Sequence, residues 1–171
     1  MFHCNGWGYP WTVPMLNGRT ICLRNIDVKK IFDLIDEHKI THFGGAPIVL
    51  NMITGAPESD KKKLKHKVYV LTAGAPPPSI IFKKMNELGF EVMHVYGLTE
   101  TYGHVTQCAW NDAWNEFDQE KQNEIKARQG VRYPNTEGVT VMNPETMKEV
   151  PKDGKTIGEI MIKGNIVMKG Y

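Results

Sequence analysis

Residues 68–95 have the sequence VYVLTAGAPPPSIIFKKMNELGFEVMHV, which predicts a strand, a helix and a second strand. Val68–Thr72 is a continuous run of the kind found in strands buried on both faces of a parallel sheet. After three prolines, Ser79 is predicted to cap a helix that ends at Gly89, with an apolar face of Ile81, Met85 and Leu88. Residues 90–95 form the returning strand. Such a βαβ unit requires a parallel sheet with a right-handed crossover.

The segments before this unit repeat the alternation of strand and helix. Residues 20–23 and 40–43 are predicted to be short strands. Asp27 is predicted to cap a helix whose apolar positions are Val28, Ile31, Phe32 and Ile35. A second helix is predicted to begin at Pro47, with Ile48, Val49 and Met52 as its apolar side.

The pattern changes after residue 110. The very polar segment 111–129 predicts a connecting helix that only Trp114, Phe117 and Ile125 can dock. From residue 130, short strands and turns follow, with strands predicted at residues 139–142 and 158–162. The sequence therefore predicts an α/β fold in three parts. These are a parallel-sheet βαβ subdomain over residues 1–110, the connecting helix over residues 111–129, and the start of a β-rich subdomain over residues 130–171.

The composition is that of a folded protein. The 171 residues are 41% hydrophobic and 23% charged, and the net charge of +2 is too small to indicate nucleic-acid binding. No stretch approaches the roughly 20 apolar residues of a membrane-spanning helix, and the first residues lack the pattern of a signal peptide. We therefore expect a soluble, cytoplasmic protein without a membrane span. Cys4, Cys22 and Cys108 are odd in number and widely spaced, so neither a disulfide framework nor a zinc site is predicted.

Two loops that follow neighbouring predicted strands carry residues suited to a ligand. In open parallel α/β sheets, ligands bind beyond the carboxyl ends of the strands because the loops converge there. Residues 73–76 form a small-residue loop on which a flat group can lie close to backbone. Tyr96 against a base, Thr99 donating to a phosphate and Glu100 holding Mg²⁺ would together fit a nucleotide. The residues leave open the alternative of an ordinary strand followed by a polar turn.

Residues 96–100, Tyr-Gly-Leu-Thr-Glu, resemble the Y-G-x-T-E signature of the adenylate-forming superfamily, which includes acyl-CoA synthetases, luciferases and peptide-synthetase adenylation domains. Phe2-His3 and then Gly74-Ala75-Pro76 precede the signature, and residues 158–164 and 167–171 follow it, in the order of the family. The resemblance covers essentially the whole chain, as an internal fragment of an AMP-forming acyl-CoA synthetase. Residues 1–7, 110–130 and 164–171 look like plant acyl-activating enzymes and bacterial ligases for short- and medium-chain acids, including methylthiopropionate.

The resemblance implies a role for each residue that matches a family motif, within an α/β subdomain that binds nucleotide and acyl group. Thr99 would bind the α-phosphate and Glu100 would ligate Mg²⁺. His3 would face the reacting carboxylate and gate the thiol tunnel, so these three are the implied catalytic residues. Trp7 and Gly97 would border the acyl pocket. The residues implied to contact the nucleotide are Gly74, Ala75, Pro76, His94, Val95, Tyr96, Gly97 and Thr99.

The implied activity is that of an AMP-forming acid–thiol ligase that uses ATP, Mg²⁺ and coenzyme A. A small carboxylic acid would become an acyl-AMP, from which coenzyme A would displace AMP. In the family, a phosphate-binding loop would lie before residue 1, and a ribose-binding aspartate, an arginine and the lysine of the C-terminal domain would lie after residue 171. The isolated chain is therefore expected to be inactive. Missing parts of its own chain are then its expected partners, and self-association through exposed apolar surface is also expected. Two alternatives remain open: an adenylating enzyme with another acceptor, through a carrier protein or oxidation, and a non-catalytic nucleotide-binding module.

Overall fold

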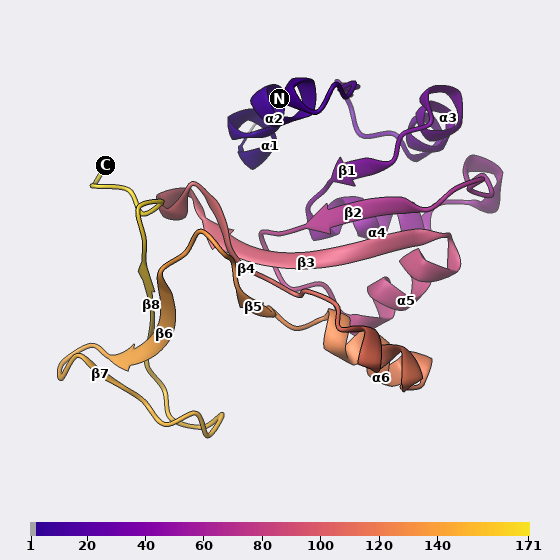
Figure 1. Ribbon diagram of the computed structural model, residues 1–171. Coiled ribbons are helices and arrows are strands. Elements are labelled where there is room, and N and C mark those ends of the chain that lie inside the picture. Colours follow the sequence, from indigo (N-terminus) through magenta and orange to yellow (C-terminus); the bar gives the residue numbers. More distant parts are fainter. Residues whose placement is uncertain (1–2) are drawn as a thin grey trace.

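The computed structural model describes residues 3–171 and contains a mixed five-stranded sheet (Figure 1). The strand order is β1-β2-β3-β4-β5, in which β1, β2 and β3 are parallel and β4 and β5 are added antiparallel. The predicted α/β fold and its parallel βαβ unit are therefore confirmed. The strands are β1 (His42–Gly44), β2 (Val68–Thr72), β3 (Phe90–Leu98), β4 (Gly103–Gln107) and β5 (Val131–Arg132).

Helices and 3-10 turns connect the strands. The helices are α1 (Cys4–Trp7), α2 (Tyr9–Met15), α3 (Val28–His38), α4 (Pro47–Gly55), α5 (Ser79–Glu87) and α6 (Gln119–Lys126). The 3-10 turns are η1 (Glu58–Asp60), η2 (Thr99–Thr101) and η3 (Asp112–Glu116). Figure 1 shows α1 and α2 beyond the β1 edge of the sheet and α5 beneath β3.

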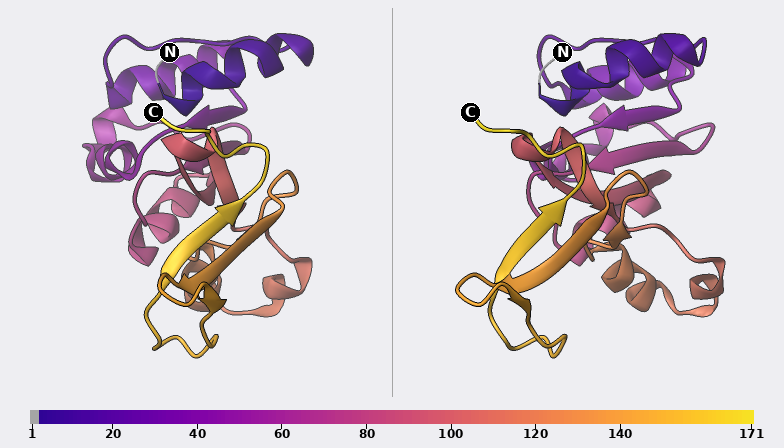
Figure 2. Two further views of the ribbon diagram at one scale, coloured as in Figure 1. Left: turned by 90° about the vertical axis from the view of Figure 1, so that its left-hand side faces the viewer. Right: turned by 60° about the vertical axis from the view of Figure 1, so that its left-hand side comes forward.

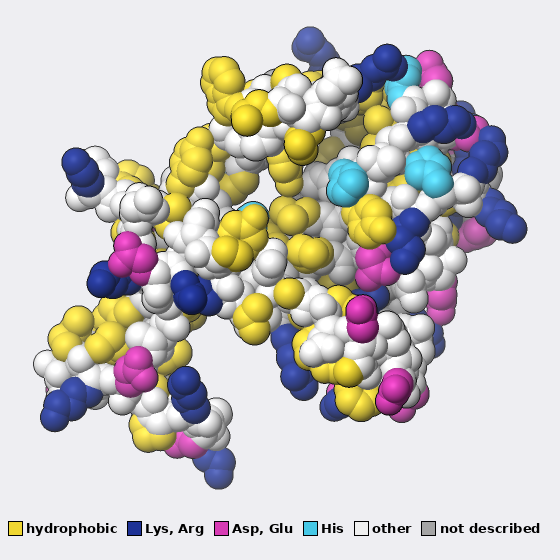
Figure 3. Space-filling model, in the orientation of Figure 1, with side chains coloured by type: hydrophobic (Ala, Val, Ile, Leu, Met, Phe, Trp, Pro, Cys, Tyr) yellow, Lys and Arg dark blue, Asp and Glu magenta, His cyan; other side chains and the backbone are white. Residues whose placement is uncertain are grey.

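The core lies on one face of the sheet. Side chains of α3, α4 and α5 pack there against alternate residues of β2 and β3, including Val68, Val70 and Val92. Because successive strand residues point to opposite faces, Tyr69 and Met93 point the other way, and they are 46% and 39% exposed. The prediction that Val68–Thr72 is buried on both faces is therefore wrong for this chain. Figure 3 shows hydrophobic side chains gathered near the centre of its view.

The cap predicted for α3 and the buried face predicted for α4 can be compared with the structure. The Asp27 carboxylate accepts a hydrogen bond from the Lys30 amide at 2.8 Å, so the predicted cap of α3 is confirmed. The face predicted for α4 is right only for Val49, which packs against the core, because Ile48 and Met52 are 63% and 39% exposed. Leu50 and Ile53 are the fully buried residues of this helix. Nearly every residue of α4 is apolar, so periodicity cannot identify its buried side.

The start of α5 also differs from the prediction in one detail. Pro78 is its N-cap residue, and Ser79 is the first helical residue and caps nothing. The face of α5 is close to the prediction, since Ile81, Phe82 and Met85 are buried. Gly89 follows the helix with φ 93°, a left-handed conformation that glycine adopts without strain.

Two other predicted elements do not form as expected. Residues 20–23 are not a strand, since no neighbouring strand in residues 3–171 pairs with them. The helix predicted over residues 111–129 is wrong as a single element, because it is divided into η3 and α6. Asp118 causes the division, since its side chain accepts from the Lys121 amide at 2.8 Å and so begins a new helix. Ile125 docks α6 to the core, whereas Phe117 stays 45% exposed.

The last third of the chain forms a three-stranded antiparallel sheet. Its order is β7-β6-β8, from β6 (Gly138–Asn143), β7 (Lys148–Glu149) and β8 (Glu159–Lys163). Figure 2 shows this sheet projecting from the larger one, and shows the C-terminus returning towards the α1 end of the molecule. Within residues 3–171, no helix combines the length and apolarity needed to cross a membrane.

Candidate nucleotide-binding site

The signature residues form a β-hairpin. β3 continues through residues 96–98, η2 turns the chain, and β4 returns antiparallel. The ladder contains a bulge between Tyr96 and Gly97. A Cβ atom added to Gly97 would lie 1.9 Å from the Gly103 carbonyl oxygen. The close approach of β3 and β4 therefore requires glycine at this position. The sequence indicated a strand end, and the returning strand was missed.

Hydrogen bonds of Thr101 hold the hairpin tip in one conformation. Its hydroxyl accepts from the Leu98 amide at 3.0 Å and lies 3.1 and 2.8 Å from the carbonyl oxygens of Leu98 and Gly103, one of which receives its proton. Thr101 is 3% exposed, so these bonds are shielded from water. Thr101 is a functional residue that the signature does not include, although three consecutive polar residues, 99–101, indicate a local turn.

Thr99 and Glu100 lie on this rigid tip. The Thr99 side chain is exposed, and the Glu100 side chain is half-buried. One carboxylate oxygen of Glu100 accepts from the Tyr171 hydroxyl at 3.0 Å, and its backbone carbonyl accepts from the Met168 amide at 2.8 Å. The hydrogen bond to Glu100 raises the pKa of Tyr171 above its usual value. The segment after β8 therefore holds Glu100 at two points, which the sequence did not predict.

The loop with Gly74, Ala75 and Pro76 lies at the same edge of the sheet. Thr72, which ends β2, is in register with His94 of the parallel strand β3. The residues that follow Thr72 and His94 therefore lie side by side at the carboxyl end of these strands. Gly74 has φ 97°, and a Cβ added to it would meet no atom within 4 Å. The exposed loop therefore presents open backbone towards solvent. Tyr96 and Gly97 continue β3 beyond this register, and Thr99 and Glu100 follow them on η2.

His94 and Val95 differ from the expectation. Each is 1% exposed, and the two side chains point to opposite faces of β3. The His94 imidazole Nδ1 lies 3.2 Å from the Ala127 carbonyl oxygen, and its ring centroid lies 6.2 Å from that of Phe82. A histidine expected to border the nucleotide thus helps to dock the end of α6 onto the core.

Two of the predicted acyl-side residues, His3 and Trp7, lie at the two ends of α1. His3 is the N-cap residue of α1, and its ring centroid lies 6.2 Å from that of Trp7. Trp7 stacks on Tyr102, which directly follows η2, with centroids 5.7 Å apart and planes at 11°. Phe2, the other residue of the upstream motif, lies outside the described residues.

The donor set fits a magnesium-bound nucleotide. Within the part of the chain that the structure describes, no group of three or more His, Cys, Asp and Glu side chains could hold a metal ion. Mg²⁺ in nucleotide sites commonly rests on one or two carboxylates together with phosphate oxygens and waters. Glu100 beside the Thr99 hydroxyl is therefore a donor set suited to Mg²⁺ that arrives with phosphate.

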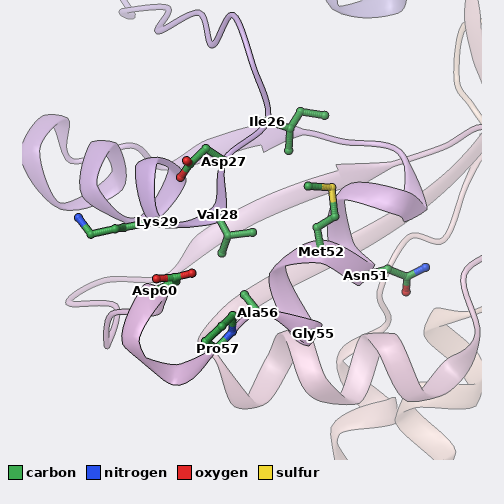
Figure 4. Close-up of a pocket in the computed structure, with 10 residues that line it drawn as sticks. All are labelled: Ile26, Asp27, Val28, Lys29, Asn51, Met52, Gly55, Ala56, Pro57 and Asp60. Atoms are coloured by element: carbon green, nitrogen blue, oxygen red, sulfur yellow. The ribbon is translucent and has the colours of Figure 1, made fainter.

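A hollow of about 650 Å³ lies elsewhere on the surface, between the start of α3 and the end of α4 (Figure 4). Asp27, Met52 and Pro57 are among its lining residues, and none of the predicted site residues lines it. It is shallow and lies on the helical layer. We therefore assign the candidate site by its residues and not by this hollow.

Comparisons with known proteins give the family and the fold. The profile described as AMP-binding enzyme matches residues 1–171. The acetate/butyrate–CoA ligase AAE7, peroxisomal, of Arabidopsis thaliana is 52% identical over 173 residues, which are 100% of this chain and 30% of that protein. The acetate–CoA ligase CCL3 of Humulus lupulus is 51% identical with the same two coverages of 100% and 30%. The chain thus spans about 30% of the length of these curated relatives.

Two solved structures are similar over nearly the whole chain. The N-terminal domain of FACL13 from Mycobacterium tuberculosis has a TM-score of 0.74 at 25% identity, covering 100% of this chain and 40% of that one. The O-succinylbenzoate coenzyme A synthetase of Bacillus subtilis, in complex with ATP and magnesium ion, has a TM-score of 0.73 at 20% identity, covering 99% and 32%. The second likeness shows the fold alone.

The names of the relatives also overturn one expectation. Several, including the AAE7 ligase and the benzoate–CoA ligase of Arabidopsis thaliana, are named peroxisomal. The prediction of a cytoplasmic protein is therefore wrong, since it rested only on the absence of membrane and secretion signals. The match of the profile to every residue, with relatives at about half identity, leads to one conclusion: the chain belongs to the family of AMP-binding enzymes.

Proposed function

We propose that this chain is part of an ATP-dependent acyl-CoA ligase, which activates a short- or medium-chain carboxylic acid as acyl-AMP and transfers it to coenzyme A. The main support is that its relatives at 43–52% identity over the full chain are named as CoA ligases for acetate, butyrate and benzoate. The local support is the hairpin tip, which carries the exposed Thr99 and the half-buried Glu100, at the edge where the exposed Gly74 loop also lies.

In the proposed site the nucleotide lies across the edge shared by β2 and β3. Gly74, Ala75 and Pro76 border the adenine, and Tyr96 packs on it. The Thr99 hydroxyl donates to an α-phosphate oxygen, and the Glu100 carboxylate binds Mg²⁺. The metal, when bound, neutralises the charge that develops on the phosphates. Because Thr101 fixes the tip, Thr99 and Glu100 need little reorganisation to meet the nucleotide.

The carboxylic acid is proposed to bind on the α1 side of the tip. His3 faces its carboxylate, and Trp7 borders its acyl chain. The carboxylate oxygen forms a bond to the α-phosphorus while the α–β phosphoanhydride breaks and pyrophosphate leaves. The coenzyme A thiolate then attacks the acyl carbon, and the bond to AMP breaks. A nucleotide- and acyl-binding part over residues 1–110, followed by the start of a β-rich part from residue 130, remains our proposed division of the chain.

The test is an assay of the complete protein that contains this chain. We expect acyl-CoA, AMP and pyrophosphate in equal amounts from ATP, Mg²⁺, coenzyme A and acetate or butyrate. Pyrophosphate release without acyl-CoA would indicate another acceptor, and ATP binding without pyrophosphate would indicate a non-catalytic module. The 171-residue chain alone is expected to form no acyl-CoA, so product from it would contradict the proposal that regions beyond it complete the site.

A further inference from the structure

Tyr102 connects the two halves of the candidate site. It directly follows η2, and its amide donates to the Thr99 carbonyl at 3.2 Å. Its phenol donates to the Trp7 carbonyl at 3.1 Å, and its ring stacks on the Trp7 indole. These two contacts join residues that are 95 positions apart in the chain.

The backbone conformation of Tyr102 is an unusual one that directs its side chain towards α1. Its φ of 53° and ψ of 31° lie in the left-handed region, which a residue with a bulky side chain rarely occupies. Tyr102 lies between Thr101, whose hydroxyl is hydrogen-bonded within the hairpin, and Gly103, which also has a positive φ of 122°. The strained residue is thereby aimed out of the hairpin and onto α1.

α1 and α2 bury little of their surface, although the Asn5 side chain of α1 also approaches Gly44 of β1, where an added Cβ would lie 2.9 Å from its Oδ1. Neither helix contains a buried residue, whereas α5 contains three. The Trp7 carbonyl is at the end of α1, where backbone acceptors lack partners within the helix, and the Tyr102 hydroxyl supplies one. Figure 3, in the orientation of Figure 1, shows the surface hollowed between these helices and the end of β3. The contact of Trp7 with Tyr102 therefore fixes one wall of that hollow relative to the hairpin tip.

We propose that Tyr102 is a positioning residue that sets the distance between the acid-binding residues of α1 and the phosphate-binding tip. The expected effect on the acid rests on the proposed function. The contact by which Tyr102 holds α1 can be tested without any activity. Tyr102 itself touches neither substrate. Its loss should weaken use of the carboxylic acid and leave use of ATP nearly unchanged, because Thr99 and Glu100 remain held by Thr101.

The experiment uses three variants of the complete protein. Tyr102→Ala removes the stack and the hydrogen bond, and Tyr102→Phe removes only the bond. Tyr69→Phe is the control for Tyr102→Phe, because Tyr69 is another partly exposed tyrosine, 46% against 64% for Tyr102, and it stacks on the His42 ring at 5.0 Å, away from α1. From the usual strengths of one aromatic pair and one hydrogen bond, we expect Tyr102→Ala to raise the KM for the acid about tenfold or more. Tyr102→Phe should raise it by about threefold, and the KM for ATP should change by less than about twofold.

Hydrogen exchange measured on the same variants supplies the second readout. Tyr102→Ala should speed amide exchange in residues 4–15 and leave β2 protected, whereas Tyr69→Phe should change neither. Equal loss in the use of acid and ATP, or unchanged exchange in residues 4–15, would overturn the inference. If Tyr102→Ala does not fold, a Tyr102→Phe variant equal to wild type in KM and exchange would do the same. A wild-type protein without ligase activity would refute the proposed function, while hydrogen exchange would still decide whether Tyr102 holds α1.

Discussion

Replacing Gly97 by alanine separates two explanations for the glycine of the signature. The family resemblance implies that it borders the acyl pocket. In the structure, however, the added Cβ would lie 1.9 Å from the Gly103 carbonyl oxygen and 2.5 Å from the His104 Cα. Both are backbone atoms and cannot rotate away. The strands must therefore move apart until these contacts exceed about 3 Å, the closest that a Cβ atom approaches such neighbours.

The size of the effect follows from what this movement breaks. Overpacking inside a well-packed region costs about 1–3 kcal/mol, and each lost backbone hydrogen bond adds about 1 kcal/mol. The pairs Gly97 with His104 and Leu98 with Gly103 lie at the clash, so the tip of the ladder separates. We expect Gly97→Ala to lower the free energy of unfolding by about 3 kcal/mol, which is a factor of about a hundred in the equilibrium constant.

The assay is urea unfolding of the purified protein, with hydrogen exchange to localise the loss to β3 and β4. Gly8→Ala is the control, because a Cβ there meets no atom within 4 Å and φ is −106°. It should change the free energy of unfolding by less than about 1 kcal/mol. A Gly97→Ala protein that unfolds like wild type, and is altered only in its preference among acids, would refute the explanation from the hairpin.

Three further predictions concern stability and titration. Phe82→Ala should lower the free energy of unfolding by about 3–5 kcal/mol in the same assay, because Phe82 is 2% exposed within the core. Hydrogen bonds from the amides of Thr156 and Lys155 lower the pKa of Asp153 to about 2. Because the folded pKa is below the usual 3.8, the stabilisation is complete above pH 3.8 and is lost as the pH falls through about 2, and carboxyl NMR should show that midpoint. Burial raises the pKa of the Cys108 thiol, so at pH 8 it should react with a disulfide reagent more slowly than the exposed Cys4 and Cys22.

The parallel part of the fold could be predicted because its signals are local. Residues 68–95 contain a strand run, a helix with one apolar face and a glycine stop, and these survive in the structure. The buried side of α4 could not be predicted, since its sequence is apolar all round. The exposure of Tyr69 could not be predicted either, because the sequence of a strand does not say whether a second layer covers it.

The sequence proposes the residues of the candidate site but does not predict how the chain folds around them. The signature located Thr99 and Glu100, and the register of β2 and β3 brings the Gly74 loop to the same edge. The hairpin is not apparent from the sequence, because residues 103–107 follow closely after a motif that is typical of a strand end. The contacts of Tyr102 with Trp7 and of Tyr171 with Glu100 span 95 and 71 positions. A local sequence pattern does not indicate contacts between residues so far apart in the chain.

The most direct test of the hairpin tip as the nucleotide site is Mg²⁺-dependent ATP–pyrophosphate exchange by a Glu100→Gln variant of the complete protein. Glutamine keeps the shape of the side chain and still accepts from the Tyr171 hydroxyl, but it loses the charge that binds Mg²⁺. Exchange should fall by about a hundred- to a thousand-fold while the urea midpoint stays at that of wild type. Exchange at the wild-type rate, with the same dependence on Mg²⁺, would contradict the assignment of this hairpin to nucleotide chemistry.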